Sequence, residues 1–296
     1  MKFDKSTEKA ISYLRKPDWL RRNLPSANEY AFIKNHLSRH ELHTICESGC
    51  CPNIGECWAA GTATFMILGN VCTRSCRFCN VETGKPSEVD SAEPERIADA
   101  ISELKLKHCV ITSVDRDDLE DGGAAIWAET ILAVKRKNPH ITIEVLIPDF
   151  KGKTTDIQKV IASKPDIISH NLETVSRLSK ELRVYAKYDT SLSVIKYISE
   201  SGIISKSGIM VGIGETEEEV LQTMDDLLAA GCSIFTIGQY LQPSKDNLAV
   251  TEYVTPEIFE KYRLIGIEKG FKYVESSPLT RSSFHSSDQL NKILPR

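Results

Sequence analysis

The sequence lacks any apolar run as long as the ~20 residues that a membrane-spanning helix needs. Its first 25 residues also lack the apolar core of a secretion signal. They carry Asp4 and Glu8 among the bases, although transit peptides are normally poor in acids. These absences argue against a membrane protein and favour a cytoplasmic or already processed one. No linker, internal repeat or low-complexity segment interrupts the 296 residues.

Excess positive charge is missing too. The chain has 37 lysines and arginines against 41 acidic residues, for a formal net charge of −4. This balance argues against a general nucleic-acid binder, although a local basic patch is compatible with it. The first 40 residues reverse it, with nine bases and four acids. We expect a solvated helical extension there, anchored by Trp19, Tyr30 and Phe32; the alternative is a docking surface for an acidic partner.

Cysteine is the residue type in excess. There are nine cysteines, and seven of them lie between Cys46 and Cys79. A chain of this length can bury a sizeable core without disulfide staples. In a reducing compartment, clustered cysteines are metal ligands or catalysts more often than disulfides, and an odd count does not suit a complete disulfide framework.

Downstream of the cysteines, short apolar runs alternate with amphipathic segments. The predicted strands are 63–70, 108–114, 141–149, 166–172, 207–213, 233–242 and 272–278. The predicted helices are 93–106, 124–137, 156–163, 174–182, 190–201, 216–230 and 256–269. Such alternation indicates parallel β-α units and favours a complete or partial barrel. Barrels carry their chemistry in the loops after the strands, and the loop after the first strand contains CTRSCRFC.

That loop spaces Cys72, Cys76 and Cys79 as C-x3-C-x2-C. Three close thiolates can hold three irons of a [4Fe-4S] cluster and leave the fourth iron open. The alternatives are a structural zinc site, which wants a fourth Cys or His that the neighbouring sequence lacks, and a redox C-x-x-C pair, which leaves Cys72 unexplained. The spacing favours the cluster.

A second group lies upstream of the first strand. Cys46, Cys51 and Cys57 are spaced C-x4-C-x5-C, and Cys50 could replace Cys51 to give C-x3-C-x6-C. Beside the other motif, this group suggests a second cluster that is again one cysteine short.

These motifs carry a family resemblance. C-x3-C-x-Phe-Cys, including Phe78, resembles the radical S-adenosylmethionine (SAM) superfamily, and CPNIGECW (51–58) is similar to lipoyl synthases. The matching segments run in order along roughly residues 15 to 290: RKPDWLRRNLP, TSVDRDDLEDGGA, SHNLETV, SGIMVGIGET, YLQPS and RSSFHSSDQ. The resemblance implies a partial parallel (β/α)6-type TIM-like barrel. It also implies an N-terminal extension (1–60) with the second cysteine group, a barrel (61–280) and a C-terminal segment (281–296).

The family inserts two sulfur atoms, at C6 and C8 of an octanoyl chain on a carrier lysine. By resemblance, Cys72, Cys76 and Cys79 hold the cluster that cleaves SAM to a hydrogen-abstracting radical. Cys46, Cys51 and Cys57 hold an auxiliary cluster that donates sulfur, which leaves Cys50 spare. Its fourth ligand in the family is a serine of the RSSY motif, here RSSF (281–284). We assign Ser283 to it, with Ser282 as the alternative.

The resemblance also implies SAM contacts at the strand ends. They are Phe78, Thr112, Ser113 and Asp115; Asn171 and Glu173 toward the ribose; Arg183 or Lys187 toward the carboxylate; and Met210, Gln239, Tyr240 and Leu241 toward the adenine. The implied partners are octanoylated lipoyl domains of 2-oxoacid dehydrogenases or the glycine cleavage H protein, and a reductant such as ferredoxin or flavodoxin. We expect a monomer that binds neither nucleic acid nor membrane.

Several positions depart from the family pattern or fall outside it. Phe284 replaces the usual tyrosine, and Val184 and Arg77 stand where proline is common. Cys109 and Cys232 are expected to pack as small apolar residues, while His285 is the one histidine to watch. Two rival functions are another two-cluster sulfur-inserting radical SAM enzyme, such as a tRNA methylthiotransferase, and a zinc-stabilised binding protein.

Overall fold

A single curved sheet forms the centre of the protein. The computed structural model describes residues 15–21, 27–59 and 62–293. Eight strands pair in the order β1-β2-β5-β6-β7-β8-β9-β10. Their bounds are β1 His43–Thr44, β2 Thr64–Ile67, β5 His108–Ser113, β6 Thr142–Leu146, β7 Ile167–Ser169, β8 Ile204–Val211, β9 Ile234–Gln239 and β10 Tyr273–Ser277. All neighbours are parallel except β1 and β2.

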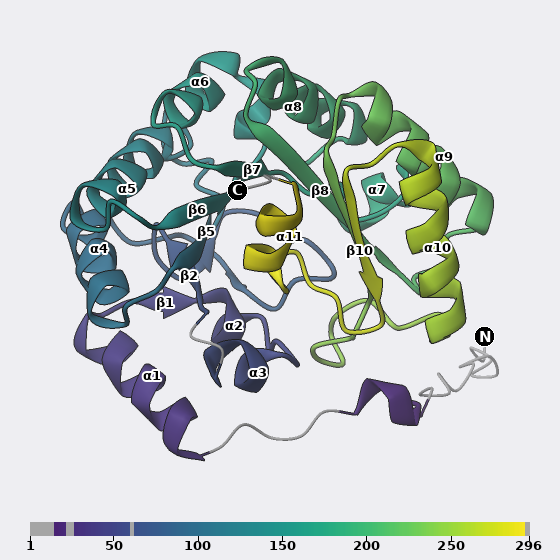
Figure 1. Ribbon diagram of the computed structural model, residues 1–296, viewed down its shortest axis with the longest axis horizontal. Coiled ribbons are helices and arrows are strands. Elements are labelled where there is room, and N and C mark those ends of the chain that lie inside the picture. The colour runs from purple at the N-terminus through teal and green to yellow at the C-terminus, as the bar shows by residue number, and fades with distance from the viewer. Residues whose placement is uncertain (1–14, 22–26, 60–61, 294–296) are drawn as a thin grey trace, which may run out of the picture.

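Helices surround this sheet on its convex side (Figure 1). They are α4 Glu93–Glu103, α5 Ala124–Lys137, α6 Thr154–Ala162, α7 Ser176–Leu182, α8 Tyr188–Glu200, α9 Glu217–Ala229 and α10 Pro256–Lys269. Among the described residues, β10 and β1 do not pair, so the sheet is an open barrel. All seven predicted strands and all seven predicted helices are present, and the predicted partial barrel with six strand-helix units is confirmed.

Local sequence explains where the helices begin and end. Thr216 and Glu219 form the predicted capping box of α9, and Gly231 after its end has the left-handed φ of 78°. Pro256 occupies the first position of α10, and Gly270 ends that helix at φ 119°. Strands β2, β5, β7, β8 and β9 are almost continuously buried, as nearly continuous apolar runs predict, whereas β10 alternates between buried and half-buried residues.

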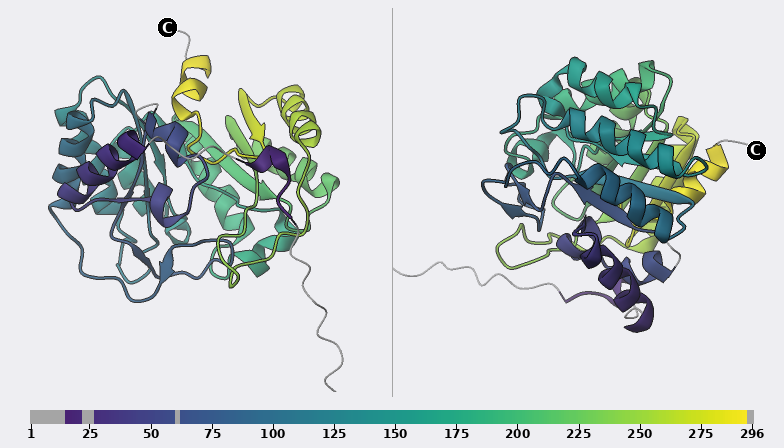
Figure 2. Two further views of the ribbon diagram at one scale, coloured as in Figure 1. Left: turned by 90° about the horizontal axis from the view of Figure 1, so that it is seen from below. Right: turned by 90° about the vertical axis from the view of Figure 1, so that its left-hand side faces the viewer.

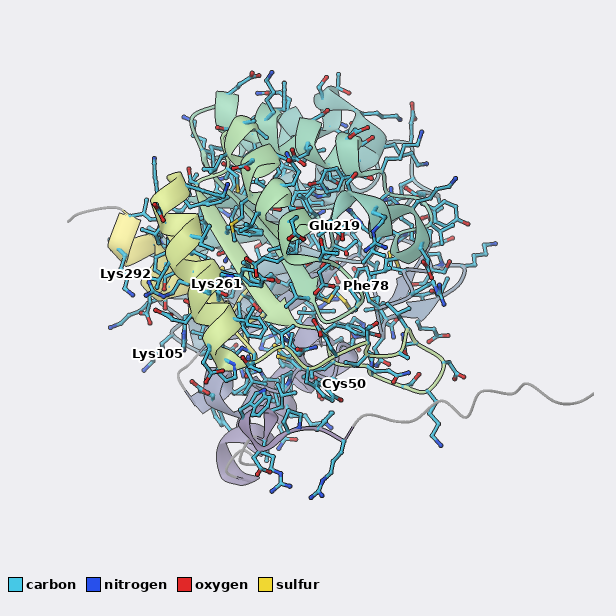
Figure 3. All side chains as sticks on the ribbon, turned by 90° about the vertical axis from the view of Figure 1, so that its right-hand side faces the viewer. Cys50, Phe78, Lys105, Glu219, Lys261 and Lys292 are labelled. Atoms are coloured by element: carbon cyan, nitrogen blue, oxygen red, sulfur yellow. The ribbon has the colours of Figure 1, made fainter. Side chains whose placement is uncertain are left out.

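A C-terminal helix closes the end of the barrel where the strands begin. Leu290 of α11 (Ser286–Ile293) packs on Ile167 and Ile234, which are the first residues of β7 and β9. Figure 2 (left) shows α11 at one end of the barrel and long loops at the other. In Figure 3, Lys105 and Lys292 mark the α11 end, and Phe78 and Cys50 lie toward the loop end.

A buried polar network ties α11 to the barrel interior. Lys206 and Glu144 form an ion pair with a 2.9 Å Nζ–Oε1 distance, and both side chains are fully buried. The Ser286 hydroxyl donates to Glu144, and the His108 Nε2 lies 2.6 Å from the same hydroxyl. Although burial opposes ionisation, Lys206 and His108 hold the pKa of Glu144 below its usual value. The network fixes the start of α11, three residues after Ser283.

The N-terminal extension packs beside β2. It contains a 3-10 turn (Asp18–Leu20), α1 Ala27–Arg39, α2 Ile45–Ser48 and α3 Ile54–Ala59. The prediction that Trp19 and Phe32 anchor it is wrong, because their side chains are 44% and 62% exposed. Ile33 and Leu37 are buried instead, since they lie four residues apart on one face of α1 while Phe32 lies off that face. The Tyr30 side chain and four of the nine basic residues of the first 40 lie outside the described residues.

A small two-stranded sheet lies between β2 and α4 in the chain. After β2 the chain forms a small parallel pair, β3 Val71–Cys72 and β4 Glu82–Thr83. The Cys72 to Cys79 loop spans the gap between these two strands. None of the helices in the described ranges combines the length and apolarity needed to cross a bilayer.

Candidate functional site

A cavity of about 620 Å³ opens where the parallel strands end; we call it the mouth cavity. Cys72, Cys76 and Cys79 line it. All the predicted SAM contacts line it as well: Phe78, Thr112, Ser113, Asp115, Asn171, Glu173, Arg183, Met210, Gln239, Tyr240 and Leu241. Lys187, the alternative to Arg183, does not line it and is exposed. The structure thus gathers these residues where barrel enzymes carry their chemistry.

Backbone amides fix the first thiol of the loop. The amide N–H groups of Arg74 and Asp115 point at the Cys72 Sγ, with N–S distances of 3.4 and 3.3 Å. Thr73 bonds to the Asp115 carbonyl through both its amide and its hydroxyl. The loop after β5 therefore holds the start of the cysteine loop in place.

Arg74 binds the cysteine loop to two other loops. Its Nε donates to Asp117 at 2.7 Å, and its Nη2 donates to Asp149 at 2.8 Å. A third carboxylate, that of Asp115, lies 3.4 Å from Nη1. Although burial opposes the charge, Asp117 and Asp149 raise the pKa of Arg74, so it stays a cation. Burial raises the pKa of Asp115, and Arg74 acts in the opposite direction.

A hydrogen-bond chain orients Arg183 in the wall of the mouth cavity. Its Nη1 donates to the Leu172 carbonyl and to the Ser191 hydroxyl, each at 3.0 Å. Ser191 in turn lies 2.9 Å from the Nε2 of His170, whose Nδ1 lies 2.9 Å from the Ile147 carbonyl. Because a carbonyl only accepts, Nδ1 carries the proton and Nε2 accepts from Ser191. The buried guanidinium thus brings a fixed positive charge near the Cys76 thiol.

A second cavity of about 320 Å³ lies toward the beginning of β2 and β5; we call it the serine cavity. Cys46 from α2, Cys57 from α3 and Cys51 from the loop between them line it. Ser283 lines it from the opposite end of the chain. The residues assigned to the auxiliary cluster are thereby brought together across more than 200 positions.

Two residues that are adjacent in sequence to the assigned ligands do not line the serine cavity. Ser282 and Cys50 both line the mouth cavity, and neither lines the serine cavity. Cys50 is exposed, accepts a hydrogen bond from the Asn80 side chain and adopts a left-handed φ of 50°. This placement suits Cys51 and Ser283, rather than Cys50 and Ser282, as ligands of one centre.

The RSSF segment is held from both sides. Asn53, two residues after Cys51, donates to the Leu279 carbonyl at 2.7 Å across 226 positions. On the other side, the Gln289 side chain donates to the Phe284 carbonyl at 2.9 Å. Phe284 is buried and stacks on His285 with ring centroids 3.7 Å apart. The Phe284 ring is therefore held by packing alone, without the hydroxyl of the usual tyrosine.

Both thiol groups have the chemistry of an iron-sulfur site. Burial raises the pKa of Cys46 and Cys79 to about 11, and that of Cys57 and Cys76 to about 12, and neighbouring thiols add to each shift. All nine cysteines are free thiols. Buried thiols that repel one another's charge need a bound cation to become thiolates, and iron provides it. Each trio of thiols lining one cavity therefore fits a [4Fe-4S] cluster short of one ligand.

Arg281 connects the two cavities. It lines both of them, and its Nη1 donates to the Thr280 carbonyl. Burial lowers the pKa of Arg281, and the nearby Cys51 raises it. Gly238 in β9 makes room for this segment, since a Cβ there would lie 2.1 Å from the Thr280 carbonyl oxygen.

The remaining predicted residues lie as follows. Cys109 and Cys232 are buried in the apolar core, as expected. His285 lines the serine cavity and lies 3.7 Å from both Glu56 and Glu275. Arg77 forms an exposed ion pair with Glu181, and Val184 is 57% exposed.

Sequence reasoning gave no role to several residues that shape the site. Arg74 lies inside the CTRSC motif and could have been found there, because an arginine between cluster cysteines needs a partner when buried. Asn53 follows Cys51 in CPN. His108, Asp149 and His170 carry no local signal, since only the fold brings them to the cavities.

The comparisons with known proteins agree with this arrangement. Residues 66–227 match the model of the Radical SAM superfamily. The chain is 56% identical over 277 residues to the lipoyl synthase of Christiangramia forsetii, covering 93% of this chain and 94% of that one. It is 58% identical over 280 residues to the lipoyl synthase of Phocaeicola vulgatus, covering 95% and 99%.

A solved structure supports the fold alone. Streptococcus suis SuiB bound to S-adenosylmethionine aligns with a TM-score of 0.57 at 13% identity, covering 93% of this chain and 60% of that chain. The full-length match to lipoyl synthases favours that family over the rival methylthiotransferase and zinc-protein interpretations.

Proposed function

The chain belongs to the lipoyl synthase family of radical SAM enzymes, and from that premise we propose that it inserts sulfur at C6 and C8 of a protein-bound octanoyl-lysine. Family membership implies SAM and two [4Fe-4S] clusters. When bound, SAM and one cluster supply one-electron chemistry that activates C–H bonds, and the other cluster supplies the sulfur. We assign the former cluster to Cys72, Cys76 and Cys79, and the latter to Cys46, Cys51, Cys57 and Ser283.

The protein's own residues provide position and charge. Arg74 joins the cysteine loop to Asp117 and Asp149, which fixes the thiols of the mouth cavity relative to the strand ends. Arg183, held by Ser191, presents a cation that suits the carboxylate of SAM. Glu173 has a left-handed φ of 66° beside the same cavity, a backbone strain typical of a ligand-binding position.

A single observation carries the proposal. The two thiol trios line separate cavities at opposite ends of β2, and Arg281 lines both. A substrate chain must reach an activating centre and then a sulfur-donating centre. It therefore needs two adjacent cavities of this kind, which here share Arg281 in their walls. We assign residues 1–60 to the extension, 61–280 to the barrel and 281–296 to the segment that completes the serine cavity.

We also propose the finer assignments. The substrate is an octanoylated lipoyl domain of a 2-oxoacid dehydrogenase or the glycine cleavage H protein, and the reductant is a ferredoxin or flavodoxin. The enzyme acts as a monomer in the cytoplasm. Ser283 would hold the auxiliary cluster through its oxygen, which would take a proton more readily than a thiolate and so be the easier ligand to release.

The test is direct. The protein is reconstituted anaerobically and incubated with SAM, a reductant and an octanoylated lipoyl-domain peptide. We expect about eight irons per chain and a peptide mass gain of two sulfur atoms for the dithiol product, or of two sulfur atoms less two hydrogens once it is oxidised to the disulfide. An unchanged peptide mass at full iron content would refute sulfur insertion, and a colourless zinc protein would refute the clusters as well.

A further inference from the structure

A separate group of metal-ligating side chains lies between α1 and α4. His36 is in the last turn of α1, His40 directly follows that helix, and Glu103 is the last residue of α4. Four residues apart on a helical path, the two imidazoles lie on one face, with ring centroids 4.8 Å apart. Their nitrogens and a Glu103 oxygen all lie within 4.8 Å of one another.

Two of the three distances between ligand atoms are close to those of a metal site. The His36 Nδ1 lies 3.6 Å from the Glu103 Oε2, and the His40 Nε2 lies 3.2 Å from the same oxygen. Zinc binds imidazole nitrogen and carboxylate oxygen at about 2.1 Å in tetrahedral geometry, which places two ligand atoms about 3.4 Å apart. The two measured distances lie on either side of that value.

The buried imidazole is in the right state to bind a metal. The His36 side chain is 3% exposed, and its Nδ1 accepts from the Arg39 guanidinium at 3.0 Å. Because Nδ1 accepts, the proton of the neutral ring is on Nε2. This nitrogen is buried, and none of its contacts has the geometry of a good hydrogen bond. The Nδ1 lone pair, 3.6 Å from the Glu103 Oε2, is therefore the one that a metal would take.

Arg39 shows that this position already attracts a cation. Its guanidinium donates to the same lone pair that a metal would take. Arg39 is exposed, so its guanidinium can turn into solvent when a metal ion displaces it. The carboxylate of Glu103 is 53% exposed, which leaves an entry path and room for a water as fourth ligand.

We propose that His36, His40 and Glu103 form a binding site for a divalent transition-metal ion of the zinc type. Two imidazoles and one carboxylate are a donor set that zinc prefers. The site is distinct from both cysteine cavities, because none of its residues lines either one.

The metal would fasten the N-terminal extension to the barrel. Arg96 of α4 already donates to the His40 carbonyl at 2.9 Å, so the two helices meet at this point. α1 also packs against α3, which carries Cys57. A metal that joins α1 to α4 therefore stabilises the support of the serine cavity without taking part in its chemistry.

The experiment measures zinc on the anaerobically reconstituted protein, so that the cluster cysteines are occupied. Equilibrium dialysis against Zn²⁺ with elemental analysis gives stoichiometry and affinity. Zinc K-edge absorption then separates nitrogen and oxygen ligands at about 2.0–2.1 Å from sulfur at about 2.3 Å. We expect one zinc per chain with a nitrogen and oxygen shell.

The variants keep the protein folded because they change exposed or partly exposed side chains. His40→Ala and Glu103→Gln should each weaken zinc binding at least tenfold, while Arg39→Ala should bind zinc as tightly as the wild type or more tightly. Glu95→Gln, on the exposed face of α4, and His140→Ala are matched controls with wild-type affinity. Sulfur ligation, or unchanged affinity in both His40→Ala and Glu103→Gln, would overturn the proposal, and weaker binding by Arg39→Ala would overturn the displacement of its guanidinium.

Discussion

Ser282 and Ser283 are adjacent in the chain and line different cavities. Ser283 lines the serine cavity with Cys46, Cys51 and Cys57, whereas Ser282 lines the mouth cavity. The sequence motif RSSF offers both hydroxyls equally. The turn between β10 and α11 separates them, with Phe284 bonded back to the Arg281 carbonyl at 2.9 Å.

The two serines should therefore respond differently to substitution. Ser283→Ala removes the oxygen ligand that we assign to the auxiliary cluster, and we expect roughly 100-fold lower sulfur insertion, the upper end of losses for altered metal shells. Ser282→Ala should keep at least a tenth of the wild-type activity. Product mass spectrometry and Mössbauer spectra of the reconstituted proteins measure both. Equal losses in the two variants would contradict the assignment.

Gly238 should be sensitive because the RSSF segment passes directly over it. A Cβ at this position would lie 2.1 Å from the Thr280 carbonyl oxygen, which is backbone and can only move with its segment. We expect Gly238→Ala to cost about 1–3 kcal/mol, as overpacking usually does. Because Thr280 precedes the motif, the variant should also retain closer to about four irons than eight.

Gly208→Ala provides the matched comparison in the neighbouring strand. Its Cβ would meet the Thr236 hydroxyl at 2.3 Å, but that is the end of a side chain, which can rotate away. We expect a smaller loss of stability and full iron content. Iron analysis and urea unfolding of the two variants in parallel measure these differences. An intact auxiliary cluster in Gly238→Ala would show that close packing at Gly238 does not position the RSSF segment.

The pattern of apolar residues predicted the fold well, except where the buried residues are polar. Strand β8 was expected from 207, but it begins at Ile204. Its early residues include Ser205 and Lys206, which read as exposed in a sequence. Lys206 is fully buried only because Glu144 on β6 neutralises it, and no local pattern reveals a partner 62 residues away.

The candidate site likewise has residues that local sequence predicted and residues that it did not. Cysteine spacing indicated two metal centres from residue types alone, because ligands of one cluster cannot be far apart in a loop. Ser283 could be assigned only by family resemblance, since a serine in a polar segment carries no signal of its own. The prediction that Trp19 and Phe32 anchor the extension was wrong because it rested on the size of their side chains. Whether a side chain is buried depends on the face of the element on which it lies.

Arg74 should be essential for the stability of the cysteine loop. Its side chain is 5% exposed and contacts Asp115, Asp117 and Asp149. Arg74→Ala leaves the buried Asp149 and the neighbouring Asp115 without this cation, and breaking buried pairs of this kind costs about 3–5 kcal/mol. Urea unfolding measures the loss.

Two further variants test the cause of that loss. Arg74→Lys keeps the charge but not the forked geometry, so it should recover only part of the stability. Lys261→Ala breaks an exposed pair with Glu217 and should change stability by less than about 1 kcal/mol. A wild-type unfolding midpoint for Arg74→Ala would show that the network does not hold the loop.

His170 should make the fold sensitive to acid. Burial lowers its pKa to about 4, with Arg183 and Arg74 acting in the same direction and the Ile147 carbonyl and Asp149 opposing. Because the folded pKa lies below the unfolded value of about 6.5, the unfolded chain binds the extra proton first. The contribution to stability is complete above about pH 6.5 and is lost as the pH falls toward 4, by up to roughly 3 kcal/mol.

His170→Asn removes this proton and can still donate to the Ile147 carbonyl. The variant should be less stable than wild type at pH 7.5, because the shorter amide does not reach the Ser191 hydroxyl as Nε2 does, and the difference should shrink as the pH falls from 6.5 to 4.5. Urea midpoints across that range measure it, with the exposed His140→Asn as the control that keeps the wild-type slope. A constant difference between wild type and His170→Asn would mean that His170 does not titrate in this range, and the acid sensitivity would then belong to the paired carboxylates.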